Sequence, residues 1–210
     1  MLFFDIGANI GRWALANKGD GVRIICVEAS PSTYATLCNN VRHESTIVPL
    51  HYAVTSTSDT SVTFYHCNTA NTLSTLDRDW LSSPDSRFGS MRGAISECTV
   101  PAISLDALIQ MHGVPDLLKI DVEGAENIVI QSLTQLVPSL CFEWASEWKD
   151  KNIECLEHLR TLGFMRFALQ HEDNYTYRPA VMDKTADDII EMLGKSVPKR
   201  DWGMIWAKPT

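Results

Sequence analysis

The chain has 210 residues, of which 45% are hydrophobic and 21% are charged, which is typical of a folded globular protein rather than a disordered one. Asp and Glu number 26 against 18 for Lys and Arg, so the net charge is −8. An acidic chain without a basic run is a poor partner for a phosphate backbone, and we do not expect nucleic acid as its substrate. The length favours a single domain over residues 1–210.

The six cysteines are scattered and form no Cys-x-x-Cys pair. This usage indicates buried free thiols in a reducing compartment, so we expect a cytoplasmic protein. No apolar run approaches the roughly 20 residues that cross a bilayer, and no signal peptide is visible.

The first element is a short buried strand at residues 2–4 that runs into a glycine turn and then a helix. Gly7 allows a tight turn, and Gly11 lets the helix pack closely on the strand. A second apolar strand at residues 22–27 ends on Glu28. An acid at the tip of that strand is where a doubly wound sheet holds the hydroxyls of a cofactor ribose.

Predicted strands and helices alternate through the rest of the chain. Ser30 and Pro31 predict the start of a helix that runs to residue 41, and Ser104 is expected to cap a short one. Further helices are expected at 124–136, 153–162 and 187–193, and strands at 47–50 (extended through 54), 61–65, 98–101, 116–120, 139–142, 164–169 and 203–207. This order predicts a doubly wound α/β fold with a mostly parallel sheet, which ends in a hairpin of its last two strands.

Residues 68–97 show no clear period and are rich in polar side chains. Such a long irregular segment is uncommon in a compact domain unless it has a function or is disordered. We consider two interpretations of residues 81–92, a lid on the substrate side that Trp80 anchors and an irregular excursion.

Three motifs identify a family resemblance: Asp5-Ile6-Gly7-Ala8-Asn9-Ile10-Gly11, Val27-Glu28-Ala29-Ser30-Pro31 and Leu118-Lys119-Ile120-Asp121-Val122-Glu123-Gly124. In order and spacing they resemble the signatures of FkbM-type S-adenosylmethionine-dependent methyltransferases. The resemblance implies a Rossmann-like, seven-stranded, mostly parallel sheet with an antiparallel terminal strand. A nicotinamide-binding domain would more usually show Gly-x-Gly-x-x-Gly, which this turn does not contain.

The resemblance also implies how S-adenosylmethionine binds. Glu28 would take the ribose hydroxyls, the backbone of residues 7–11 would meet the methionine end with Asp5 orienting that loop, and Asp121 would lie near the methionyl portion. The predicted cofactor-binding residues are Asp5, Gly7, Asn9, Gly11, Glu28, Ala29, Ser30, Ala53, Ser74 and Asp121.

Acidic residues stand at the predicted carboxyl ends of several strands, the edge at which such sheets bind ligands. A hydroxyl acceptor is a weak nucleophile and benefits from a base. Glu123 and Glu143 are the catalytic candidates, and Asp121 could serve instead. A metal site formed by these three carboxylates is an alternative, because hard cations prefer oxygen ligands, but they have no metal-site spacing signature and no metal is predicted.

The resemblance favours an O-methyltransferase that acts on a sugar or glycan, with a terminal rhamnose as one candidate acceptor. It also suggests a module fused to glycosyltransferase domains, as in glycan-building proteins of large DNA viruses. Trp80, Trp144 and Trp148 would suit a sugar face, although tryptophans of this kind are more often core residues. The alternatives are a small non-sugar acceptor, an RNA ribose, or a scaffold domain that binds the cofactor without catalysis.

Overall fold

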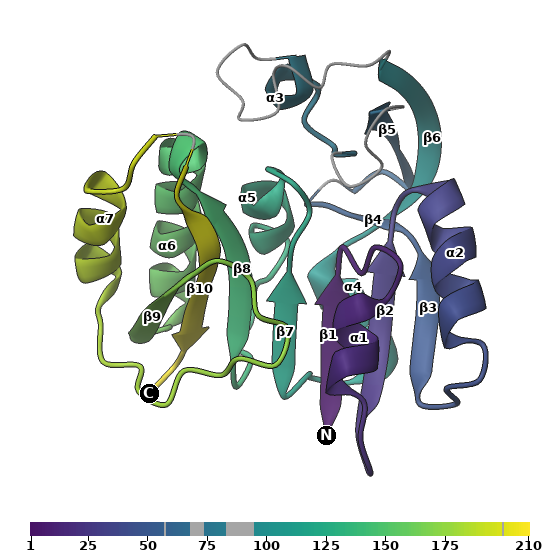
Figure 1. Ribbon diagram of the computed structural model, residues 1–210, viewed down its shortest axis with the longest axis horizontal. Coiled ribbons are helices and arrows are strands. Elements are labelled where there is room, and N and C mark those ends of the chain that lie inside the picture. The colour runs from purple at the N-terminus through teal and green to yellow at the C-terminus, as the bar shows by residue number, and fades with distance from the viewer. Residues whose placement is uncertain (57, 68–73, 83–94, 199) are drawn as a thin grey trace.

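The computed structural model describes residues 1–56, 58–67, 74–82, 95–198 and 200–210. A seven-stranded sheet forms its centre, and the first five strands in its spatial order run parallel (Figure 1). The order is β3 (Ile47–His51), β2 (Arg23–Glu28), β1 (Leu2–Ile6), β7 (Leu117–Ile120), β8 (Leu140–Ala145), β10 (Trp202–Lys208) and β9 (Arg166–His171). The last strand of the sequence, β10, is antiparallel to both neighbours, which confirms the predicted fold class and the terminal hairpin.

Helices cover both faces of this sheet. The helices are α1 (Arg12–Asn17), α2 (Pro31–Val41), α4 (Leu105–His112), α5 (Glu126–Ile130), α6 (Lys149–Leu162) and α7 (Ala186–Gly194). Alternation along β1 sends Phe4 and Ile6 into the larger core with α4 to α7, and Phe3 into the core that contains α1 and α2. Asp5 therefore lies on the α1 face of the sheet.

A smaller sheet stands above the carboxyl ends of β2 and β3 (Figure 1). It contains β4 (Ala53–Val54), β6 (Ile95–Ile103) and β5 (Ser61–Cys67). The third strand predicted at 47–50 is confirmed as β3, but its extension leaves the large sheet after His51, and Ala53 pairs with Ala102 instead.

Helix α3 (Arg78–Ser82) and the 3-10 turn η3 (Ser146–Trp148) pack together with Cys67 of β5 in the smaller sheet. Part of the segment predicted to be irregular is thus helical. Most of the predicted lid, residues 83–92, falls outside the described residues.

Capping decides where several helices begin and end. The Ser30 and Ser104 hydroxyls accept hydrogen bonds from the backbone N–H groups of Thr33 and Ala107, so both predicted caps are confirmed. The helix predicted at 124–136 was wrong in length, because α5 ends at Ile130. The Ser132 hydroxyl donates to the Val129 carbonyl at 2.6 Å and accepts from the Leu105 N–H at 3.0 Å, a local pairing that competes with helix continuation.

The connection between β9 and α7, residues 172–185, is here called the strap. It crosses in front of β10 and β8 toward α1 before it returns to α7 (Figure 1). Across the described residues, none of the helices is both long enough and apolar enough to span a membrane.

Candidate functional site

A cavity of about 340 Å³ opens at the carboxyl ends of the parallel strands, beneath the smaller sheet. A volume above about 300 Å³ is in the range of small-molecule and cofactor sites. The cavity is lined by seven of the ten predicted cofactor residues, Gly7, Asn9, Glu28, Ala29, Ala53, Ser74 and Asp121, and by all three catalytic candidates, Glu123, Glu143 and Asp121. Asp5, Gly11 and Ser30 lie behind this lining.

The glycine turn brings the ends of β1 and β7 into close contact. Gly7 has a φ of +75°, and a Cβ there would stand 1.7 Å from the backbone oxygen of Asp121. The N–H groups of Gly7 and Ala8 both donate to the Val27 carbonyl, at 2.9 and 3.0 Å. Only glycine fits at position 7, which leaves the turn backbone exposed to the cavity.

Gly11 also has a positive φ, +87°, but its close neighbour differs from the predicted one. A Cβ there would lie 2.8 Å from Leu37 and 3.3 Å from Val41, both on α2. Gly11 therefore allows helix α2, rather than strand β1, to pack close to the start of α1.

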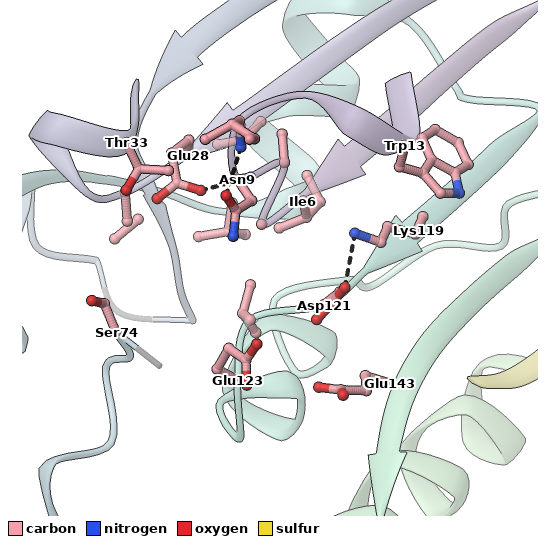
Figure 2. A pocket seen from close by; sticks show the side chains of 18 of the residues that line it. Ile6, Asn9, Trp13, Glu28, Thr33, Ser74, Lys119, Asp121, Glu123 and Glu143 are labelled. Atoms are coloured by element: carbon pink, nitrogen blue, oxygen red, sulfur yellow. Dashed lines mark hydrogen bonds and ion pairs between the residues drawn. The ribbon is translucent and has the colours of Figure 1, made fainter. Parts of the chain in front are cut away.

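Glu28 links the tip of β2 to the glycine turn. One carboxylate oxygen accepts from the Asn9 N–H at 2.9 Å (Figure 2), and the other from the Ser30 N–H at 2.8 Å. The side chain is 8% exposed, and burial raises its pKa to about 7 against these two hydrogen bonds. Ser30 thus acts through its backbone and as the cap of α2.

Asp5 was predicted among the cofactor-binding residues, but it is buried in the sheet and does not line the cavity. Its side chain is 0% exposed, and the Lys119 ammonium lies 3.1 Å from Asp5 and 3.1 Å from Asp121. Burial raises the pKa of Asp5 although Lys119 opposes the shift. Burial disfavours the Lys119 charge, but Asp121 and Asp5 hold the pKa of Lys119 well above its usual value.

Lys119 was not among the predicted site residues. Asp5 and Lys119 are register partners on adjacent strands, and two-residue alternation places Lys119 and Asp121 on the same face. The strand register and the two-residue alternation could together have identified Lys119 from the sequence.

The loop after Asp121 is shaped by a buried acid that the sequence analysis missed. Glu126 accepts hydrogen bonds from the N–H groups of Val122 at 2.8 Å and Gly124 at 3.0 Å. It holds the loop in a form that gives Glu123 a φ of +55° and directs that side chain into the cavity (Figure 2). Burial raises the pKa of Glu126 to about 7.

One carboxylate oxygen each from Asp121, Glu126 and Glu143 lies within 4.8 Å of the other two. We call these three residues the carboxylate cluster. Hard divalent cations prefer oxygen ligands of this kind. From the sequence, Glu123 was considered as a metal ligand together with Asp121 and Glu143, but the structure places Glu126 beside those two residues instead. The expectation that no metal binds stays a prediction.

The three tryptophans considered as a sugar platform are core residues. Trp144 is fully buried and donates from its ring nitrogen to the Gln170 carbonyl at 3.1 Å. Trp80 and Trp148 are buried against each other, edge to face, with ring centroids 5.5 Å apart. None of them lines the cavity, so the core interpretation is confirmed and the sugar platform is not.

Other aromatic residues line the cavity instead: Trp13, Tyr52, Phe64, Tyr175 and Trp202. The strap contributes Tyr175 together with Asp173. The strap carries no recognisable motif, so only the three-dimensional structure reveals these two residues.

The family model that describes the methyltransferase FkbM domain matches residues 5–179. The chain belongs to the FkbM methyltransferase family. The hexuronic acid methyltransferase AglP of Haloferax volcanii is 27% identical over 145 residues, which are 67% of this chain and 53% of AglP. The chain thus spans about half the length of this curated relative.

Solved structures resemble the fold. A precorrin-6y C5,15-methyltransferase from Geobacter metallireducens matches with a TM-score of 0.51 and 10% identity, over 100% of this chain and 80% of that chain. Fibrillarin from Aeropyrum pernix, in complex with natively bound S-adenosyl-L-methionine, matches at a TM-score of 0.46 and 14% identity, over 98% of this chain and 65% of that chain.

The cofactor of this methyltransferase is S-adenosylmethionine, which supplies a methyl group bonded to a positively charged sulfur. The cavity fits such a molecule. The Gly7 turn presents backbone without a side chain, Glu28 offers carboxylate oxygens for hydroxyls, and acids surround the region near Asp121 where positive charge would lie. Because methyl transfer is an in-line displacement, the main task of these residues is to hold and align the reactants.

Proposed function

We propose that the protein is an S-adenosylmethionine-dependent O-methyltransferase of a sugar or glycan hydroxyl, and that residues 1–210 act as one domain. The observation that carries the proposal is the set of carboxylates Asp121, Glu123 and Glu143 around one end of a cavity that fits the cofactor. Such a group serves a neutral hydroxyl acceptor in two ways, since carboxylates accept hydrogen bonds from hydroxyls and one of them can remove the proton. The name of the relative, a hexuronic acid methyltransferase, supports the sugar class.

Glu143 is our choice for the general base. Both Glu126 oxygens accept backbone N–H groups, and Asp121 is ion-paired with Lys119. Glu143 stands near the carboxyl end of β8, on the rigid sheet, and lines the cavity. Glu123 lies on a loop, and we assign it to acceptor binding.

A scaffold function is less well supported than catalysis. A domain that only bound the cofactor would have no need for Glu123 and Glu143, which line the cavity together with Asp121. The net charge of −8 likewise gives little support to an RNA ribose as the acceptor.

The test is transfer of a radiolabelled methyl group to a panel of neutral and acidic saccharides, with small phenols and an RNA oligonucleotide beside them. We expect transfer to a saccharide. Transfer only to phenols or RNA would contradict the proposal, as would the absence of transfer to every acceptor by protein that binds the cofactor.

The role of Glu143 is tested with Glu143→Gln, which we expect to lower the rate of transfer about 100-fold or more at unchanged affinity for S-adenosylhomocysteine. Glu157→Gln is the matched control, because Glu157 is a partly exposed glutamate on α6 that pairs with Arg160 and does not line the cavity. An unchanged rate for Glu143→Gln would remove Glu143 as the base and return Glu123 to that role.

A further inference from the structure

The strap closes one end of the cavity with two side chains, Asp173 and Tyr175. This is the end toward Trp13, because Arg178 of the strap lies over the Trp13 ring. Trp13 and Glu28 lie on opposite sides of Figure 2, with Lys119 and Asp121 between them. The predicted ribose ligand Glu28 marks the adenosine end. The strap therefore borders the part of the cavity left for the methionine end of the cofactor.

The strap is fixed to the body of the protein by Arg178. Its guanidinium lies over the rings of Trp13 and Trp206, 5.7 and 5.4 Å from their centroids, and donates to the Asn17 side chain at 2.6 Å. Asn17 in turn donates to the Tyr175 carbonyl at 2.9 Å. An arginine between two aromatic rings with a hydrogen-bond partner is a firm anchor, so Asp173 and Tyr175 are held in place rather than left on a free loop.

Charge near this end of the cavity is unbalanced. The Lys119 ammonium is shared by Asp5 and Asp121, each 3.1 Å away. Asp173 adds a third carboxylate to the group, and it makes no hydrogen bond or ion pair with the part of the chain that the structure describes. Burial raises the pKa of Asp173, and the charge of Asp121 acts in the same direction. One cation among three carboxylates leaves room for a second positive group.

We propose that Asp173, together with Asp121, binds the ammonium group of the methionine portion of the cofactor, and that the anchored strap is the wall of that subsite. Asp121 supplies one side from the position just after β7, and Asp173 supplies the other from a segment distant in sequence. A carboxylate that would otherwise stay half-buried and unpaired gains a charge-assisted hydrogen bond only when the ligand is present. The inference rests on the cofactor site and does not depend on the acceptor.

The test is calorimetric titration with two ligands that differ by one group, S-adenosylhomocysteine and its desamino analogue, in buffer that contains EDTA. EDTA removes any divalent cation that the carboxylate cluster could bind. We expect the wild type to prefer S-adenosylhomocysteine. We expect Asp173→Asn to lower its affinity for S-adenosylhomocysteine about tenfold or more and to leave the affinity for the desamino analogue unchanged.

Asp183→Asn is the matched control, because Asp183 is an exposed aspartate of the same strap that pairs with Lys184 at 3.0 Å and does not line the cavity. It should bind both ligands as the wild type does, and melting temperatures check that both variants are folded. An equal loss for both ligands in Asp173→Asn would overturn the proposal, since it would report a general change of the pocket. No loss for either ligand would overturn it too, as would a wild type that does not discriminate between the ligands. A failure of the sugar hypothesis would instead be seen only in the transfer assay.

Discussion

Replacing Glu28 by glutamine separates its proposed ligand role from its structural role. The two carboxylate oxygens accept one N–H each, from Asn9 and Ser30. Glutamine keeps the size of the side chain but has only one oxygen, so its amide N–H₂ must face one of the two donors. Leaving a buried donor unpaired costs about 1–3 kcal/mol.

The buried charge has an opposing effect on the free energy of unfolding. The pKa of Glu28 rises from 4.5 to about 7 on folding, so the folded protein holds this proton more tightly than the unfolded chain. The contribution of Glu28 to stability therefore falls as pH rises from about 4.5 to 7, by about 3 kcal/mol in total. At pH 8 the gain from removing the charge offsets most or all of the loss from the mispaired amide, whereas at pH 5 most of that gain is absent and the loss dominates.

We therefore expect Glu28→Gln to unfold in urea within about 2 kcal/mol of the wild type at pH 8 and to be clearly less stable than it at pH 5. Binding should change more at pH 8, where the carboxylate is ionised. Loss of a charge-assisted hydrogen bond to a ribose hydroxyl would lower the affinity for S-adenosylhomocysteine about 10- to 100-fold in a calorimetric titration. Unchanged affinity at pH 8 in the folded variant would refute the assignment of Glu28 to the ribose.

Three further perturbations test the rest of the site. Gly7→Ala should lower both the melting temperature and the cofactor affinity, because its Cβ would meet the Asp121 carbonyl at 1.7 Å. The control Gly21→Ala has a similar φ of +72° and nothing within 4 Å of the added Cβ, so it should keep full affinity, and equal affinity losses in the two variants would contradict this reasoning. Lys119→Met should lower the free energy of unfolding by about 3–5 kcal/mol in urea, because Asp5 loses its cation. The double variant Lys119→Met/Asp5→Asn should regain part of that stability, and a double variant no more stable than Lys119→Met would contradict the ion-pair argument. EDTA should leave the methyl-transfer rate unchanged, and a rate that falls with EDTA and returns with Mg²⁺ would show that the carboxylate cluster binds a catalytic cation.

The parts of the fold that local sequence determines were predictable. Apolar runs marked every strand of the large sheet, and Ser30 and Ser104 marked helix starts, because strand periodicity and capping depend on residues close in the chain. The glycine turn was predictable for the same reason, since a positive φ at Gly7 is needed wherever a strand turns sharply into a ligand-binding helix.

Features that depend on partners far apart in sequence were predicted less well. Trp144 was considered for a sugar platform next to Glu143, but two-residue alternation sends the two side chains to opposite faces, Trp144 to the core and Glu143 to the cavity. The length of α5 depends on Ser132 and its bond to the distant Leu105 N–H, which no helical period reveals.

Site residues show the same division. Glu28 and Asp121 stand at strand tips in local motifs and were found. Lys119 and Glu126 act behind those motifs, through an ion pair and through backbone N–H groups. Asp173 reaches the cavity only because the strap folds back across the sheet, and its neighbours in sequence give no sign of that return.

The most direct test of the central claim is to identify the atom that receives the methyl group. The protein is incubated with S-adenosylmethionine that carries an isotopically labelled methyl group and with the saccharide panel, and the product is analysed by nuclear magnetic resonance. The account predicts a labelled methyl bonded to a sugar oxygen, at one position, formed by the wild type and nearly lost in Glu143→Gln. A label bonded to nitrogen or carbon, or saccharides that all stay unlabelled while another acceptor is methylated, would contradict it.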